Sequence, residues 1–258
     1  MNNLHEMIKR ADDGDKDAMF RVAWDIVWGD PEAELEPELA EKALGYYFQL
    51  AQDGDCDSML DLGAMYLDGR GVEKNESKAL SWYRKAADMV YPKAFRCIGN
   101  YWMYYSDSSP DVERAFDAFV KGSICDEQNS LYELGDIYRK GDYMEKDDFF
   151  AFALYERAGE VIARNDFSYE NGDVSWDDCY SDVRLRLGEC YLDGVGTSAN
   201  IEMAVEYLQD AVNIYKRRIA EGDDPKGVNS KQLVRAQESL ADALQRQDLA
   251  EGSKYIGA

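Results

Sequence analysis

The sequence has almost no histidine and far fewer basic than acidic residues. Its one histidine, His5, has no cysteine or second histidine at ligand spacing, so the sequence offers no basis for a zinc site or a histidine-activated nucleophile. Lys and Arg total 29 against 52 Asp and Glu, a formal net charge of -23. This charge repels phosphates, so it excludes nucleic acid and anionic membranes as expected partners and favours a basic protein.

Long apolar runs and paired cysteines are also lacking. No stretch of about 18 apolar residues occurs, and residues 1–10 lack a basic start followed by an apolar run, so neither membrane insertion nor export is expected. The five cysteines are an odd number without C-x-x-C spacing, which is typical of reduced, partly buried thiols. These features predict a cytoplasmic protein, and self-repulsion between copies favours a monomer.

Motifs for catalysis or for a cofactor are not found. The turns at 69–71 and 194–196 contain G-x-G but follow helical patterns and lack a third glycine. The acidic segments 142–148 and 173–178 lack the spacing and central glycine of a calcium-binding EF-hand loop. Carboxylate pairs are too abundant in so acidic a chain to indicate a catalytic pair. We therefore expect no enzymatic activity, no cofactor and no metal.

What the chain does contain is a repeat. Residues 58–87 read S-M-L-D-L-G-A-M-Y-L-D-G-R-G-V-E-K-N-E-S-K-A-L-S-W-Y-R-K-A-A, which predicts two helices around a glycine-rich turn. The frame set by Gly63 returns around Gly99, Gly135 and Gly188, and a degenerate copy precedes them. A glycine inside a helix costs about 1 kcal/mol relative to alanine, so these framing glycines predict close approach of the partner helix.

Short Asp-Gly-Asp linkers, at 13–15 and 53–55, separate the first helices. Each combines a glycine suited to end one helix with an aspartate suited to cap the next. The helical hairpins formed in this way complete their apolar faces only against their neighbours.

The segment 58–87 resembles the Sel-one-like (Sel1-like) repeat family, a branch of the tetratricopeptide-like helical repeats. It departs from the family pattern A-x-x-x-L-G-x-x-Y-x-x-G-x-G-V-x-x-D-x-x-K-A-x-x-W-Y-x-K-A-A at Ser58 and Asn75, and weaker copies extend the resemblance over about residues 15–212. The resemblance implies an all-α solenoid, a right-handed α-α superhelix of about five antiparallel helix pairs with capping helices. It also implies an adaptor or scaffold role.

We expect a single repeat domain over residues 1–258. Gly135 and Gly188 are 53 residues apart, whereas the two earlier framing intervals are 36 each, so the chain contains an insertion. This insertion is either a functional loop or a tolerated one. The predicted parts are an N-terminal capping helix at 1–14, repeats one to four at 15–164, an acidic insert loop at 165–178, repeat five at 179–221, and a C-terminal capping helix and tail at 229–258.

Family geometry, in which the first helix of each pair lines a concave face, implies a partner-binding groove. The expected groove residues are Phe20, Trp24, Trp28, Leu60, Arg96, Asn100, Met103, Tyr104, Asn129, Tyr132 and Arg139. Arg96, Asn100, Tyr132 and Arg139 are expected to contact a carboxylate, a peptide backbone or an acidic side chain. The alternative is that the aromatic residues pack against the N-terminal helix and the arginines balance local acids.

Three functions remain open at this point. The leading one is an adaptor or scaffold that binds a protein or peptide in the groove. The second is a neutralising, immunity-type protein that binds a basic toxin or a nucleic-acid-binding protein through its acidic surface. The third, an enzyme built on the helical scaffold, has no supporting motif.

Overall fold

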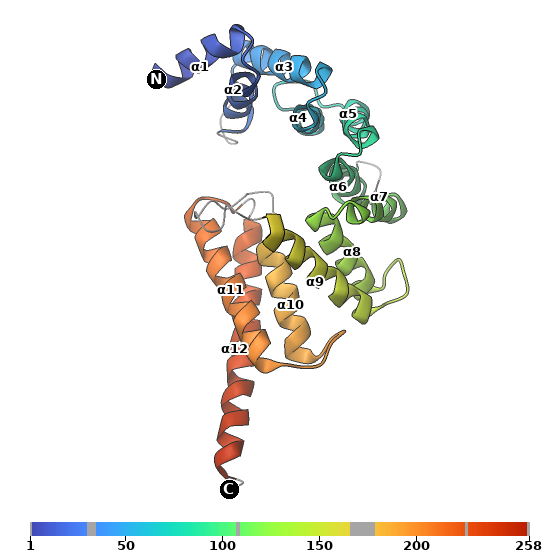
Figure 1. Cartoon of the computed structure of the whole chain (residues 1–258), viewed down its shortest axis with the longest axis vertical. Helices are drawn as coiled ribbons and strands as arrows, with labels where there is room; N and C mark the ends of the chain where they lie inside the picture. The colour runs from blue at the N-terminus through green and yellow to red at the C-terminus, as the bar shows by residue number, and fades with distance from the viewer. Residues whose placement is uncertain (1, 30–34, 107–108, 166–178, 225–226, 257–258) are drawn as a thin grey trace. The chain divides into compact units, whose positions relative to one another are not determined.

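The chain is all-α, as predicted from the repeats. The computed structural model describes residues 2–29, 35–106, 109–165, 179–224 and 227–256, and these residues form helices and no strand (Figure 1). Within these ranges, none of the helices combines the length and apolar character needed to cross a bilayer. The helices are α1 (Asn2–Asp12), α2 (Lys16–Trp28), α3 (Pro37–Gln52), α4 (Cys56–Asp68), α5 (Glu76–Asp88), α6 (Pro92–Asn100), the π-helical turn η1 (Tyr101–Tyr105), α7 (Val112–Ile124), α8 (Gln128–Lys140), α9 (Asp148–Asn165), α10 (Tyr180–Asp193), α11 (Ile201–Ala220) and α12 (Val228–Ile256).

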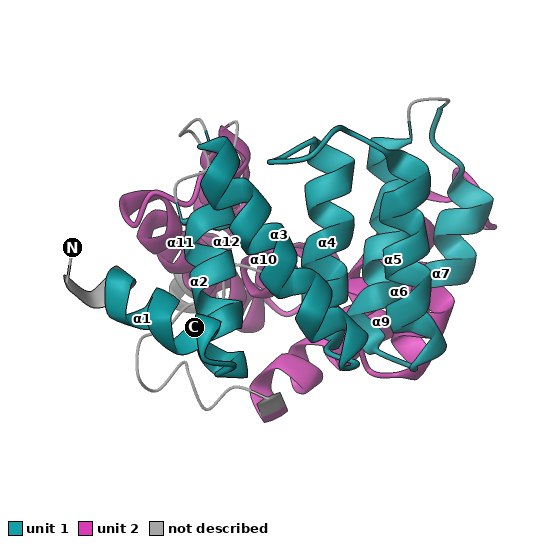
Figure 2. Ribbon diagram, turned by 90° about the horizontal axis from the view of Figure 1, so that it is seen from above, with its two compact units in different colours: residues 1–118 teal, residues 119–258 magenta. Residues whose placement is uncertain are grey.

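The helices gather into two compact units, Met1–Ala118 and Phe119–Ala258 (Figure 2). In unit 1, each helix from α1 to α6 packs against the next. In unit 2, the same holds from α8 to α12. Each unit is therefore a stack of antiparallel hairpins, and the expectation of one domain over the full chain stays a prediction.

The framing glycines lie where two helices come closest. A Cβ atom added at Gly63 would lie 2.2 Å from the ring of Tyr83, and one at Gly135 would lie 2.5 Å from the ring of Tyr155. At Gly188 it would lie 2.6 Å from the facing helix. These distances are far below van der Waals contact, so the predicted close approach is confirmed at these three positions.

The Asp-Gly-Asp linkers also adopt the predicted geometry. Gly14 and Gly54 have φ angles of +95° and +91°, which side chains disfavour. The carboxylates of Asp15 and Asp55 each accept a hydrogen bond from the backbone N–H three residues on, at 3.1 and 2.7 Å. One helix therefore ends as the next begins, and this places the N-terminal turns of α2 and α4 beside the linkers.

The C-terminal helix α12 closes unit 2. Ala236, Leu240 and Ala243 on one face of α12 are buried against α10 and α11, as expected of a capping helix. The helix runs from Val228 to Ile256, so it takes up almost all of the segment predicted as capping helix and tail at 229–258. Of the predicted insert, residues 166–178 lie outside the described residues, after the end of α9 at Asn165.

None of the five cysteines, all within the described ranges, forms a disulfide, and each is partly or fully buried, in agreement with the prediction of reduced thiols. His5 is exposed on α1, as expected for a surface histidine.

Candidate functional site

The expected groove residues are divided between the two units, and each set is described within its own unit. Unit 1 holds Phe20, Trp24, Trp28, Leu60, Arg96, Asn100, Met103 and Tyr104; unit 2 holds Asn129, Tyr132 and Arg139.

Three aromatic residues form a stripe along α2. Phe20, Trp24 and Trp28 follow one another at intervals of four residues, which places them on one face of the helix. Trp24 is 43% exposed, whereas Phe20 and Trp28 are partly buried at the edge of the unit 1 core. The Phe20 ring contacts the ring of Tyr47 edge-on, with centroids 6.0 Å apart. The stripe is thus anchored at its two ends and exposed at its centre.

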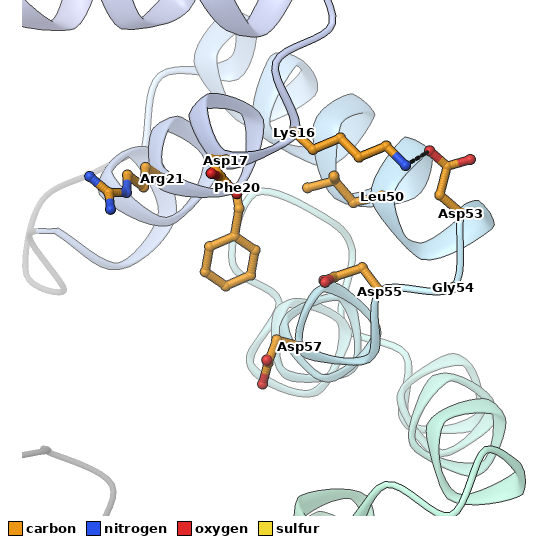
Figure 3. A pocket seen from close by; sticks show the side chains of 9 residues that line it. All are labelled: Lys16, Asp17, Phe20, Arg21, Leu50, Asp53, Gly54, Asp55 and Asp57. Carbon is orange, nitrogen blue, oxygen red and sulfur yellow. Dashed lines mark ion pairs between the residues drawn. The ribbon is translucent and has the colours of Figure 1, made fainter. Parts of the chain in front are cut away.

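A pocket of about 610 Å³ lies next to this stripe, between α2 and α4 (Figure 3). Its aromatic wall is Phe20, and its cations are Lys16 and Arg21. Lys16 pairs with Asp53 at 2.8 Å, and Arg21 points away from the carboxylates. The pocket therefore combines two apolar side chains, Phe20 and Leu50, with four aspartates and two cations. The lining residues are Lys16, Asp17, Phe20, Arg21, Leu50, Asp53, Gly54, Asp55 and Asp57.

Two carboxyl groups on α4 have distinct environments. Asp57, at the pocket, accepts a hydrogen bond from the Tyr91 hydroxyl at 2.6 Å and lies 3.6 Å from Lys93 Nζ. Asp61 lies one helical turn further on and is half-buried. Burial raises the pKa of Asp61 to about 7, with a further increase from Asp57, although the nearby Tyr47 hydroxyl opposes the rise.

The other expected groove residues of unit 1 differ in exposure. Leu60 belongs to the core of unit 1, with 9% of its surface exposed, and is not among the residues that line the pocket. Arg96 and Asn100 on α6 are half-buried, and the side-chain oxygen of Asn100 is buried without a hydrogen-bond partner among the described residues. In the π-helical turn, Met103 is half-buried and Tyr104 is 59% exposed.

In unit 2, the expected groove residues are engaged by their own unit. Tyr132 packs near Tyr155, with ring centroids 6.1 Å apart, and burial raises the pKa of its hydroxyl. Arg139 pairs with Glu189 of α10 at 3.2 Å, and Asn129 donates a hydrogen bond to a neighbouring glutamate at 3.2 Å. Arg139 is therefore paired within its own unit, and its contact with a partner stays a prediction.

A buried ion network surrounds these residues, and the sequence analysis missed it. Arg186 of α10 donates two hydrogen bonds to Asp136 of α8, at 2.8 and 3.0 Å, and the two residues are 7% and 8% exposed. Arg235 of α12 holds Glu189 in the same bidentate way, at 2.6 and 2.7 Å. The Tyr155 hydroxyl donates to Asp136 at 2.7 Å. The network links α8, α9, α10 and α12.

One signal in the sequence could have revealed part of this network. Asp136 and Glu189 each follow a framing glycine directly, so they occupy the same position in two successive repeats. The four cations around these two carboxylates, Arg139, Lys140, Arg186 and Arg235, give unit 2 a local positive excess in an otherwise acidic chain. The described residues contain no group of three or more His, Cys, Asp or Glu side chains placed to hold a metal ion.

Comparison of the chain with known proteins gives matches in sequence over a third of its length. An uncharacterised protein of Neisseria meningitidis is 34% identical over 86 residues, which are 33% of this chain and 18% of that protein. A chitin synthase regulator of Saccharomyces cerevisiae is 31% identical over 91 residues, 34% of this chain and 13% of that protein. The chain therefore spans less than a fifth of either relative.

Similar solved structures cover more of the chain. A Sel1 repeat protein from Oxalobacter formigenes matches 82% of this chain and 55% of its own, with a TM-score of 0.63 and 24% identity. An immunity protein from Pseudomonas aeruginosa matches 89% of this chain and 83% of its own, with a TM-score of 0.52 and 21% identity. At these identities the likeness supports the helical-repeat fold alone. The Sel1 repeat model matches residues 56–91, 128–160 and 181–213, so the chain contains Sel1-like repeats at these three segments.

Proposed function

We propose that the chain is an adaptor or scaffold that binds a protein or peptide partner along the first helices of its repeats. The observation that carries this proposal is the aromatic stripe of α2, where the exposed Trp24 lies one turn from Phe20 at a pocket of about 610 Å³. A large aromatic side chain next to a pocket is typical of the residues that dominate protein–protein affinity. The protein would act as a cytoplasmic monomer without catalysis of its own.

The proposed contact residues extend over both units. Trp24 and Tyr104 offer exposed aromatic surface in unit 1, and Arg139 lies in the positive cluster of unit 2. Arginine held in a fixed orientation by Glu189 is suited to receive a carboxylate or a backbone carbonyl from a partner. The proposed set is Phe20, Trp24, Trp28, Leu60, Arg96, Asn100, Met103, Tyr104, Asn129, Tyr132 and Arg139.

Affinity capture from the native host's lysate tests this proposal. The baits are the wild type, Trp24→Ala and the control Leu249→Ala, which removes another exposed apolar side chain, from α12. Circular dichroism establishes that both variants remain folded. We expect mass spectrometry to find a partner that the wild type and Leu249→Ala retain and that Trp24→Ala loses. Equal capture by all three baits would contradict binding at the α2 stripe.

A second candidate function is a neutralising, immunity-type role. Two observations favour it, the net charge of -23 and the fold likeness to an immunity protein of Pseudomonas aeruginosa. Here a basic toxin or nucleic-acid-binding protein would be held by the acidic surface as a whole. Such a partner would be captured by Trp24→Ala as well as by the wild type, and moderate salt would release it.

A further inference from the structure

We propose that the groove between α2 and α4 binds a basic segment of the partner, with an arginine or lysine side chain held between the aromatic stripe of α2 and the carboxylates of α4. This inference rests on the proposed function and adds the chemistry of the partner. The groove is defined by the pocket residues together with Trp24 and Asp61, and it lies entirely within unit 1.

The aromatic side of the groove suits a cation. Phe20 forms one wall of the pocket, and Figure 3 places its ring in the space between the two helices. Trp24, one turn along the same face, presents an indole that is 43% exposed. Indole and phenyl rings attract ammonium and guanidinium groups through their faces, and arginine is the more frequent partner.

The acidic side of the groove has few cations of its own. Lys16 is engaged by Asp53 at 2.8 Å, and Arg21 points away. Asp17, exposed at the start of α2, makes no ion pair in the described part of the chain. Asp57 meets Lys93 at 3.6 Å, a long and exposed contact. The pocket lining holds four aspartates against two cations, so an incoming cation meets a net negative charge.

Asp61 extends this acidic side away from the pocket mouth. It follows Asp57 by one turn of α4, so the two carboxyl groups share a helix face. Tyr47 connects Asp61 to the aromatic side, because its hydroxyl interacts with Asp61 and its ring contacts Phe20. Burial holds the pKa of Asp61 near 7, and a carboxyl kept in so unfavourable a place is typical of functional sites.

The occupant follows from this combination. An apolar segment would leave the carboxylates buried without a partner, and an acidic segment would be repelled by them. A segment with an arginine or lysine satisfies both sides of the groove at once. The net charge of -23 would also speed its encounter with the protein.

The tryptophan indoles provide the test. The chain has five tryptophans, and their side-chain N–H signals can be followed by heteronuclear NMR and assigned by substitution. The probes are three peptides of equal length that differ at one position, which is arginine, its uncharged isostere citrulline, or glutamate. Titrations at about 0.15 M salt, where the Debye length is about 8 Å, suppress long-range attraction. We expect saturable shifts of the Trp24 signal with the arginine peptide alone.

Charge variants provide the control. Asp17→Asn/Asp57→Asn should weaken binding of the arginine peptide at least about tenfold. The matched variant Asp142→Asn/Asp147→Asn, which removes the same charge from unit 2, should leave it unchanged. If Asp57→Asn disturbs folding, Asp17→Asn alone serves, because Asp17 is exposed.

The outcomes separate this inference from the proposed function. Equal binding of the citrulline or glutamate peptide overturns recognition of a cation but leaves the groove as a binding site. If both charge variants weaken binding of the arginine peptide equally, the inference is overturned, because attraction by the negative charge of the whole surface would then explain the binding. If no peptide shifts the Trp24 signal, the inference is overturned, and the lysate capture with Trp24→Ala decides the proposed function separately.

Discussion

Asp61 is a side chain whose charged form opposes the stability of the fold. Its pKa is raised from 3.8 to about 7, so between these values the folded state holds a proton that the unfolded state has released. The stability that the protonated Asp61 contributes to the fold is therefore fully present below pH 3.8. It is lost as the pH rises through about 7, because the buried carboxyl group then becomes charged. We expect Asp61→Asn to raise the free energy of unfolding at pH 8 by about 1–3 kcal/mol and to flatten this pH dependence.

Urea denaturation of the wild type and Asp61→Asn over this pH range measures the effect. Asp17→Asn is the control, because Asp17 is exposed and makes no ion pair among the described residues. A stability profile that is the same in the wild type and Asp61→Asn would contradict the raised pKa.

Two glycines inside helices should respond in opposite ways to the same substitution. Gly63→Ala places a methyl group 2.2 Å from Tyr83, so it should destabilise the protein by about 1–3 kcal/mol despite the gain in helix propensity. Gly45→Ala meets nothing within 4 Å and should stabilise it by roughly 0.5–1 kcal/mol. Thermal melts of the two variants measure these effects. A rise in the melting temperature of Gly63→Ala would show that Gly63 is not needed for helix approach.

Helices α8 and α10 are joined by the buried ion pair of Asp136 and Arg186, in which each charge is stabilised by the other. Arg186→Met leaves Asp136 buried with its strongest partner gone, and we expect a loss of about 3–5 kcal/mol. The double variant Arg186→Met/Asp136→Leu should recover much of this loss, because two apolar side chains replace two buried charges. Arg246→Ala, which breaks an exposed pair on α12, should change stability by less than about 1 kcal/mol.

Denaturant titrations of these variants measure the coupling. A double variant as unstable as Arg186→Met would mean that the Asp136 carboxylate is needed for the Tyr155 hydroxyl more than for Arg186.

The helices and their ends could be predicted because their signals are local. Each framing glycine and each Asp-Gly-Asp linker acts on residues within a few positions along the chain. The repeat pattern was therefore sufficient to predict where the helices begin and end. The partners of charged side chains could not be predicted in the same way. Arg186 and Asp136 are 50 residues apart. Arg139 was expected to meet a carboxylate from a partner, and the carboxylate it meets is Glu189 of its own unit.

The pocket was also beyond the sequence analysis, although Phe20 was among the expected contact residues. Four aspartates from α2, α4 and the linker line it, and in a chain with 52 acidic residues their spacing alone carries no information. Their significance depends on the aromatic residues that the fold brings beside them.

Added salt should raise the thermal stability of the whole molecule. The net charge of -23 produces repulsion that is stronger in the compact state than in the unfolded one. Raising the ionic strength from about 0.01 to about 0.15 M shortens the Debye length from about 30 to about 8 Å, so the melting temperature should rise. Circular dichroism melts measure it; a fall would mean that attractive ion pairs outweigh the net repulsion.

The Asp136–Arg186 ion pair also constrains the order in which the repeats can follow one another along the chain. Arg186 lies two positions before framing Gly188, and the residue two positions before framing Gly63 is Asp61. If the repeat around Gly63 were moved to follow α8 and α9, Asp61 would take the place of Arg186 opposite Asp136, and two carboxylates would meet where one ion pair now lies. The repeats share a backbone plan but are not interchangeable modules, because each carries the charge that fits its own neighbour.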